Sequence, residues 1–314
     1  MNRPNQLRLS MRLRIASIVA SGALAVAACT GTGASPTPEG TTIVVTYSVL
    51  GAVVEDLVGD AATVRVLMPN GADPHEWEPS AKDIETLTKA DLLVENGLGL
   101  EGGMANAFAQ AEAAGVKRFV ASDHVTIRQV GSGEGADPED PDQAPGAEDP
   151  HLWMDPLTVR DAMNALAGQL KTDLGIDVSA RARDLDARLA TLNDEVAAIV
   201  AVIPDARRTL VTGHESLGYF AQRYDLRLIG AIIPSLSSSA EPSAADLAAL
   251  AEKIRAAKVP AIFTELGTSP AVAEAVGEET DAKVVELTTH AIPADGLYGT
   301  FMKDIATLVA DNLR

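Results

Sequence analysis

Two nearly identical phrases each place a histidine between a proline and a tryptophan. Residues 73–77 read DPHEW and residues 149–153 read DPHLW, although the 314 residues hold only five histidines and two tryptophans. Proline restricts the backbone before each imidazole, and a tryptophan ring can exclude water beside it. Neutral imidazoles held in this way are typical metal ligands. His75 and His151 are therefore candidate ligands of one ion.

Two further histidines follow expected strands in the second half of the chain. His214 comes two residues after a β-branched run that ends at Thr212, and His290 comes three residues after Leu287. Ligands of parallel α/β sheets collect at the carboxyl ends of the strands. We therefore expect these two side chains to converge with His75 and His151. His124 also follows an expected strand, but it lacks a comparable sequence frame and is interpreted as an ordinary core or surface imidazole.

Strand-like and helix-like runs alternate along most of the chain, which is typical of α/β proteins. The expected strands are 42–46, 64–68, 92–95, 117–121, 209–212, 226–233, 261–264 and 283–287. The expected helices are 49–58, one from Ser80, 104–114, 156–174, 179–203, 218–224, 243–257, 270–280 and 297–313.

The helix expected over 179–203 is the longest, at on the order of 36 Å. Four strands precede it and four follow it, so the sequence predicts two α/β lobes with mainly parallel sheets. The expected divisions are an N-terminal lobe over 42–178, the linking helix, and a C-terminal lobe over 204–314. The helix would join the lobes rigidly, and the metal site would lie in the cleft between them.

The first 28 residues are typical of a secretory signal, with four arginines before a short apolar run. The run ends in Val-Ala-Ala-Cys, which resembles the lipobox of bacterial lipoproteins, and Cys29 is the only cysteine. We expect Cys29 to be lipidated and residues 29–41 to tether an extracytoplasmic protein to the bacterial cell membrane. The alternative is a chance cysteine beside a simple cleavage site.

The chain is strongly acidic, with a formal net charge of −19 that becomes −23 when the four leader arginines are removed. Such a charge argues against nucleic acid as a partner and favours the collection of cations. Residues 131–150 hold seven acids, four prolines and no base, which predicts a mobile loop. This loop either collects cations weakly or serves as a solvated spacer.

Motifs of common enzymes are missing from the sequence. It contains no Walker loop, no glycine-rich dinucleotide turn and no Gly-x-Ser-x-Gly elbow. Neither His75 nor His214 is followed by a second histidine four residues on, so the metalloprotease signature is also missing.

The chain resembles the metal-specific solute-binding lipoproteins of bacterial ABC importers, the zinc and manganese group. The resemblance extends from Ile43 to the C-terminus and is strongest over residues 71–75 (GADPH), 149–156 (DPHLWMDP) and 211–220 (VTGHESLGYF). It implies two α/β lobes joined by one rigid helix, as the pattern of elements also predicts. It further implies a monomeric receptor that hands its ion to a permease driven by an ATPase.

The resemblance assigns His75 and His151 as the ligands of the first lobe and His214 as the third ligand. The third ligand is histidine in zinc-like members and often glutamate in manganese-like ones. The family usually has aspartate in the fourth place, where this chain has His290. His290 fits the offset from the last strand better, and Asp295 is the alternative.

Two glutamates and both tryptophans are expected to act around the ligands rather than on the ion. Glu215 would either orient His214 from behind or face solvent, and Glu265 could do likewise at the floor of the cleft. Trp77 and Trp153 are expected to pack.

Four nitrogen ligands favour Zn²⁺ over Mn²⁺, which prefers more oxygen. They leave no open position for an activated water, so we expect capture and release of an ion and no catalysis. The affinity should fall as the pH drops toward and below about 6.5. Because the linking helix is continuous, binding should bring small shifts and loop ordering and not wide hinge closure.

Two other functions remain open on the sequence. One is a zinc hydrolase with His75, His151 and His214 as ligands, water in the fourth place, and Glu215 or Glu265 as base. The other is a surface metallochaperone or adhesin on the same scaffold, which a co-transcribed permease and ATPase would distinguish from an import receptor.

Overall fold

The structure is a computed structural model that describes residues 40–132, 134 and 144–314, all within one compact unit. The expected signal sequence, Cys29 and most of the expected tether lie outside the described residues. Within those ranges, no helix is both long enough and apolar enough to cross a membrane.

Two four-stranded sheets form the centre of the fold, and every strand pairing within them is parallel. The first has the order β2-β1-β3-β4, and the second has the corresponding order β6-β5-β7-β8. The strands are β1 (Thr42–Val45), β2 (Thr63–Val66), β3 (Leu92–Glu95), β4 (Lys117–Val120), β5 (Thr209–Thr212), β6 (Arg227–Ala231), β7 (Ala261–Thr264) and β8 (Lys283–Glu286). The predicted fold class of two parallel α/β lobes is confirmed.

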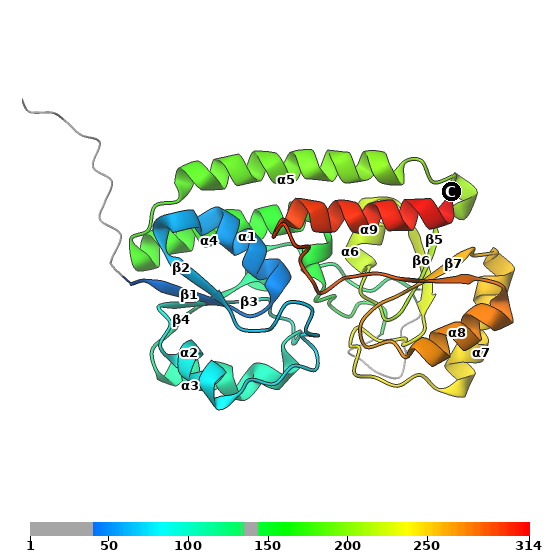
Figure 1. The fold of residues 1–314 in the computed structure, drawn as a ribbon, viewed down its shortest axis with the longest axis horizontal. Coiled ribbons are helices and arrows are strands. Elements are labelled where there is room, and N and C mark those ends of the chain that lie inside the picture. Colours follow the sequence, from blue (N-terminus) through cyan, green and yellow to red (C-terminus); the bar gives the residue numbers. More distant parts are fainter. Residues whose placement is uncertain (1–39, 133, 135–143) are drawn as a thin grey trace, which may run out of the picture. The chain divides into compact units, whose positions relative to one another are not determined.

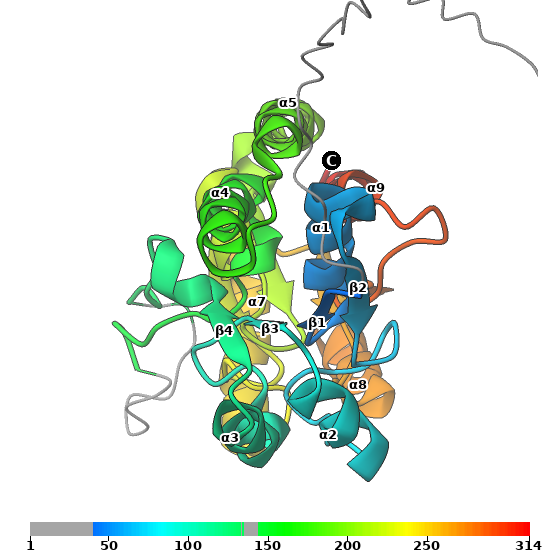
Figure 2. The same cartoon turned by 90° about the vertical axis from the view of Figure 1, so that its left-hand side faces the viewer.

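Helices cover both faces of the first sheet (Figures 1 and 2). On one face lie α1 (Ser48–Val58) and α4 (Pro156–Leu174), and on the other lie α2 (Ala81–Thr88) and α3 (Ala105–Ala113). A sheet enclosed in this way buries both faces of its strands, and all four residues of β3 are buried.

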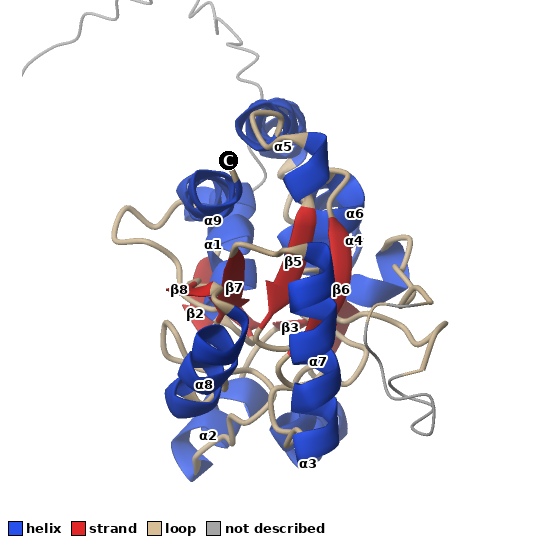
Figure 3. Ribbon diagram, turned by 90° about the vertical axis from the view of Figure 1, so that its right-hand side faces the viewer, coloured by secondary structure: helices blue, strands red, loops and turns tan. Residues whose placement is uncertain are grey.

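The second sheet is also enclosed, by α6 (Gly218–Arg223) and α9 (Tyr298–Leu313) on one side and by α7 (Ala244–Ala257) and α8 (Pro270–Thr280) on the other. Figure 3 shows α7 and α8 in front of this sheet. Alternate residues of a strand point to opposite faces. Accordingly, Phe263 joins the core shared with α9, while its neighbour Ile262 packs in the separate cluster under α7 and α8.

Helix α4 has the end signals that its sequence predicts. Asp155 is the N-cap and accepts a hydrogen bond from the backbone N–H of Leu157 at 2.9 Å. Pro156 occupies the first turn, where it gives up no helical hydrogen bond. Gly175 ends the helix in the left-handed conformation, with φ +70°. These signals fix where the segment after His151 becomes helical.

The long helix α5 (Ser179–Val200) crosses above both sheets in Figure 1. Its buried stripe packs on α1, α4 and α9 and consists of Ala182, Leu185, Leu189, Leu192, Val196 and Val200. The helix ends three residues earlier than expected, because Pro204 disfavours helical backbone in the residue before it.

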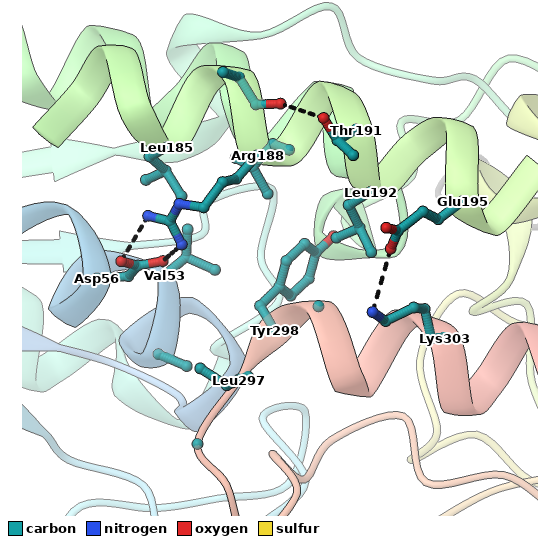
Figure 4. Close-up of a pocket in the computed structure, with 15 residues that line it drawn as sticks. Val53, Asp56, Leu185, Arg188, Thr191, Leu192, Glu195, Leu297, Tyr298 and Lys303 are labelled. Carbon is teal, nitrogen blue, oxygen red and sulfur yellow. Dashed lines mark hydrogen bonds and ion pairs between the residues drawn. The ribbon is translucent and has the colours of Figure 1, made fainter.

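Ion pairs tie α5 to α1 and to α9 (Figure 4). Arg188 reaches both carboxylate oxygens of Asp56 on α1, at 2.6 and 2.8 Å. Lys303 on α9 lies 3.2 Å from Glu195. Between the three helices lies a pocket of about 380 Å³ with an apolar floor. Helix α5 thus contacts elements that flank the first sheet and the C-terminal helix of the second.

The C-terminal end of the acidic segment 131–150 pairs with the residues that directly precede the segment. Gln129 and Glu148 form an antiparallel bridge, and Asp149 donates its backbone N–H to the carbonyl of Arg128 at 2.9 Å. Residues 133 and 135–143 lie outside the described part of the chain, so the expected mobility of this loop stays a prediction.

Candidate metal centre

Loops at the carboxyl ends of both sheets deliver four histidines to one place. His75 lies between β2 and α2, His214 between β5 and α6, and His290 between β8 and α9. His151 comes at the end of the long segment that connects β4 to α4. The four histidines thus lie at the sheet edges where ligands of α/β proteins usually bind.

Three of these imidazoles point their Nε2 atoms at a common centre. The Nε2 atoms of His75 and His151 are 3.3 Å apart, and those of His151 and His214 are 3.2 Å apart. Nitrogen ligands about 2.0–2.1 Å from a tetrahedral ion would be about 3.3–3.4 Å apart. Lone pairs at such distances repel unless a proton or a cation lies between them. The three rings therefore fit a metal ion.

His290 lies beside this cluster and is nearly fully buried, with 5 % of its surface exposed. Its ring stacks on that of His214, with centroids 6.2 Å apart and an interplanar angle of 11°. Its Nε2 atom is buried without a hydrogen-bond partner among the described residues. A buried polar atom without a partner is unfavourable, so this nitrogen is available to a fourth bond. The three-nitrogen cluster itself contains only His75, His151 and His214.

The aspartate of each repeated phrase shapes the loop around its histidine. Asp73 accepts the backbone N–H of His75, and Asp149 accepts that of His151, each at 2.9 Å. This contact, two residues along the chain, is an Asx turn. Asp149 also lies 2.9 Å from Nδ1 of His151, which leaves Nε2 free for the ion. Neither aspartate was singled out from the sequence, although both precede a candidate ligand by two residues.

A buried arginine supports Asp149 from behind. Nη1 of Arg128 lies 3.0 Å from Oδ2 of Asp149, and the same guanidinium also pairs with Glu134. A Cβ atom on Gly218 would lie 2.3 Å from both Nη1 and Oδ2. Glycine is therefore required where α6 begins. Sequence reasoning missed Arg128, because its position 21 residues before Asp149 carries no local signal.

Glu265 supports two of the histidines. Its Oε1 atom lies 3.1 Å from Nδ1 of His214. Its Oε2 atom accepts the hydroxyl of Thr289 at 2.7 Å, and that hydroxyl oxygen lies 3.1 Å from Nδ1 of His290. Both rings are thereby held with Nδ1 toward the carboxylate side and Nε2 toward the cluster. The sequence-based expectation for Glu265 agrees with this position.

Two other sequence candidates, Glu215 and Asp295, make no contact with the clustered imidazoles among the interactions of the described residues. Glu215 is buried, and no hydrogen bond or ion pair between described residues joins it to His214. Burial and the charges of Glu134 and Asp149 raise the pKa of Glu215 to about 8. Asp295 is exposed and accepts bonds at the start of α9, from Leu297 N–H at 3.0 Å and the Thr300 hydroxyl at 2.7 Å. Its position does not favour the alternative of Asp295 as fourth ligand.

His124 is exposed and stacks on Phe119, with ring centroids 4.6 Å apart. It takes no part in the cluster, as the sequence predicts.

Trp153 packs between the ligands of the two lobes. Its ring centroid lies 5.3 Å from that of His151 and 5.8 Å from that of His290. Its Nε1–H donates to the carbonyl of Thr289 at 3.1 Å, and its own carbonyl accepts the Tyr298 hydroxyl at 2.7 Å. The expected packing role is confirmed, and the indole also joins the two lobes. Trp77 is partly buried and packs against the larger of the two hydrophobic clusters.

Access to the cluster is from the side of His75. His151 and His214 are fully buried, whereas His75 is only partly buried. It lines a cleft of about 710 Å³ whose other walls include Glu148, Leu236 and Ser237. An ion would therefore enter from this cleft and meet His75 first.

Without a metal, the protonation of the cluster is uneven. Burial lowers the pKa of His214, but the charge and hydrogen bond of Glu265, together with the charges of Asp73 and Asp149, outweigh burial and raise this pKa above its usual value. Burial and the neighbouring histidines hold the pKa of His75 far below its usual range. Burial lowers the pKa of His290 to about 4. Near neutral pH, His75 and His290 are therefore neutral, and a proton competes with the metal at His214.

We expect His214 to release a proton when the metal binds. As the pH falls below the raised pKa of His214, the apparent affinity for zinc should drop by about tenfold per pH unit. Protonation of His290 should add to this competition as the pH approaches 4. Competition titrations with a chelator between about pH 5 and pH 8 measure this slope. In Glu265→Gln the drop should begin at lower pH, and an affinity independent of pH in this window would contradict the assignment.

The chain is similar to known metal-binding lipoproteins and to a periplasmic zinc-binding protein. The chain is 27% identical over 274 residues to the manganese-binding lipoprotein MntA of Halalkalibacterium halodurans, covering 84% of each chain. The solved periplasmic zinc-binding protein TroA of Treponema pallidum aligns with a TM-score of 0.76 at 25% identity, over 87% of this chain and 99% of that one.

A third similar structure is that of the laminin-binding protein Lmb of Streptococcus agalactiae, described as bifunctional with adhesin and metal-transporting activity. It aligns with a TM-score of 0.73 at 25% identity, over 88% of this chain and all of that one.

The sequence profile of the family described as zinc-uptake complex component A, periplasmic, matches residues 43–311. That match includes nearly all of both sheets, the long helix α5 and the four candidate ligands. The chain therefore belongs to this family of metal-binding substrate-binding proteins of ABC importers, whose members are receptors and not enzymes.

Proposed function

We propose that this protein captures Zn²⁺ outside the cytoplasm and delivers it to a membrane permease driven by an ATPase. The observation that carries the proposal is the convergence of three Nε2 atoms, two pairs of which lie at 3.2 and 3.3 Å, beside the free Nε2 of His290. With His290 as the fourth ligand, the ion would have four nitrogens and no open position. Such a site stores an ion and does not activate water.

Zinc is the proposed cargo because all four candidate ligand atoms are imidazole nitrogens. Mn²⁺ prefers carboxylate, carbonyl and water oxygens, and the carboxylates of Asp149 and Glu265 are directed to the outer nitrogens of the histidines. The names of similar proteins support either metal, since MntA is described as manganese-binding and TroA as zinc-binding. The choice of zinc over manganese in this proposal therefore rests on the four imidazole nitrogens.

The location and the motion are also proposals. Lipidation of Cys29 would hold a monomer at the outer face of the cell membrane, with residues 29–41 as the tether. The ion pairs of α5 with Asp56 and Lys303 support small shifts of the loops and no wide opening of the lobes.

Titration of the purified, metal-free protein with Zn²⁺ and with Mn²⁺ tests the proposal. We expect zinc to bind with a dissociation constant below about 1 μM, and manganese to bind at least about a hundredfold more weakly. With free zinc at about 1,000 times the dissociation constant, unfolding should cost about 4 kcal/mol more, which a thermal melt detects. Zinc binding weaker than micromolar, or equal binding of the two ions, would contradict the proposal.

A further inference from the structure

The loop that carries His290 is tied to the opposite lobe by an asparagine side chain. Nδ2 of Asn70 donates to the carbonyl of Ile292 at 2.8 Å, and Oδ1 of Asn70 accepts the backbone N–H of Ile292, also at 2.8 Å. The amide side chain thus pairs with one residue as a neighbouring backbone strand would. Asn70 lies in the β2–α2 loop, five residues before His75.

Two further contacts hold the backbone of His290 itself. Its carbonyl accepts the hydroxyl of Ser48 at 3.0 Å and the backbone N–H of Gly71 at 3.3 Å. Ser48 begins α1, so both donors belong to the first lobe. We call the contacts of Asn70, Ser48 and Gly71 with His290 and Ile292 the clasp.

The clasp holds the backbone of a candidate ligand whose ring is held by the second lobe through Thr289. Between β8 and α9, residues 287–297 contain no helix or strand. Within the second lobe, the polar contact of the His290 ring is that between Nδ1 and the hydroxyl of Thr289. Ordering such a loop at the moment of binding would weaken affinity, because backbone freedom is lost. If the loop is already held in place before the ion binds, less backbone freedom is lost on binding, and the affinity is higher.

We propose that Asn70 is a positioning residue for the metal site, which holds His290 against the three-histidine cluster from the opposite lobe. This inference rests on the proposed function and on His290 as the fourth ligand. When the clasp opens, the loop 287–297 can carry His290 away, and the ion is left on three nitrogens with His75 facing the cleft. Asn70 therefore controls how long the ion stays bound.

The test is a double-mutant cycle between Asn70→Ala and His290→Ala, read out as zinc affinity and as the rate of zinc release to a chelator. In the otherwise unchanged protein, Asn70→Ala should speed release by about tenfold and leave the association rate nearly unchanged. In the His290→Ala background, the same substitution should have no effect, since the ligand through which Asn70 acts is gone. A loss that came from general loosening of the loop would appear in both backgrounds.

Asn164→Ala is the matched control. Asn164 is also an exposed asparagine with a side-chain hydrogen bond, to Asp186 at 2.7 Å, but it lies on α4. Asn164→Ala should leave the rate of zinc release unchanged. Equal effects of Asn70→Ala in the two backgrounds would overturn the inference, and so would the lack of any effect in the protein that keeps His290. In either case, normal zinc binding by the unaltered protein would leave the proposed function standing. Failure of the unaltered protein to bind zinc would remove both.

Discussion

Replacing His75 and His151 together by alanine should lower the affinity for zinc by about 10⁴-fold. Structural zinc sites bind with about 10–16 kcal/mol, which is roughly 3 kcal/mol, or about a hundredfold, for each of four ligands. The two side chains contribute both Nε2 atoms of the 3.3 Å pair. Their removal would leave only His214 and His290, both from the second lobe. Competition with a chelator of known affinity measures the loss.

His124→Ala is the control for this double variant. It also removes an imidazole, but one that stacks on Phe119 outside the cluster, so zinc affinity should stay within about twofold of the original. Because His151 is fully buried, urea unfolding of the apo double variant is needed beside the affinity measurement, to check that the protein remains folded. Zinc binding that survived in the double variant would show that the ion sits elsewhere.

The fold could be predicted from local patterns, because the sequence signals of each helix and strand lie within a few neighbouring residues. The Asp155-Pro156 start and the Gly175 end of α4 are examples, and both lie where the sequence predicts. The repeated alternation of strands and helices also predicted that neighbouring strands would pair in parallel. The end of α5 was misplaced by three residues, since the apolar period continued past the point where Pro204 ended the helix.

The candidate ligands could be singled out from the sequence, whereas most of the groups that hold them could not. Each histidine is marked by its phrase or by its place after a strand, which are short-range features. The partner of Asp149 is Arg128, and the partner of the His290 loop is Asn70, 222 residues away from Ile292. Contacts of this kind depend on how two lobes meet, and no periodicity in one segment encodes them. The same reason explains why Glu215 was considered for an orienting role that Glu265 occupies.

The two lobes support their ligands by different means. In the first lobe, aspartates two residues before His75 and His151 fix the backbone. In the second lobe, one carboxylate at the end of β7 serves His214 directly and His290 through Thr289. The first arrangement can be read from a repeated phrase, and the second arises only when two adjacent parallel strands, β7 and β8, end side by side.

Arg128→Met should destabilise the metal-free protein by about 3–5 kcal/mol, because it leaves a buried charge without its partner. The side chain of Asp149 is fully buried, and that of Arg128 is 5% exposed. Methionine keeps much of the length of the arginine stem but cannot compensate the carboxylate. Urea unfolding of the apo protein measures the loss as a lower midpoint at an unchanged slope.

Arg255→Met is the matched control, since Arg255 pairs with Glu279 at 3.0 Å while both side chains are about half exposed. An exposed pair contributes about 0–1 kcal/mol, so the difference between the two variants isolates burial. Zinc should recover part of the loss in Arg128→Met, because the metal makes His151 a stronger donor from Nδ1 to Asp149. If Arg128→Met were no more destabilising than Arg255→Met, the ion pair behind His151 would have no structural importance, and the orientation of that ligand would have to come from its backbone turn alone.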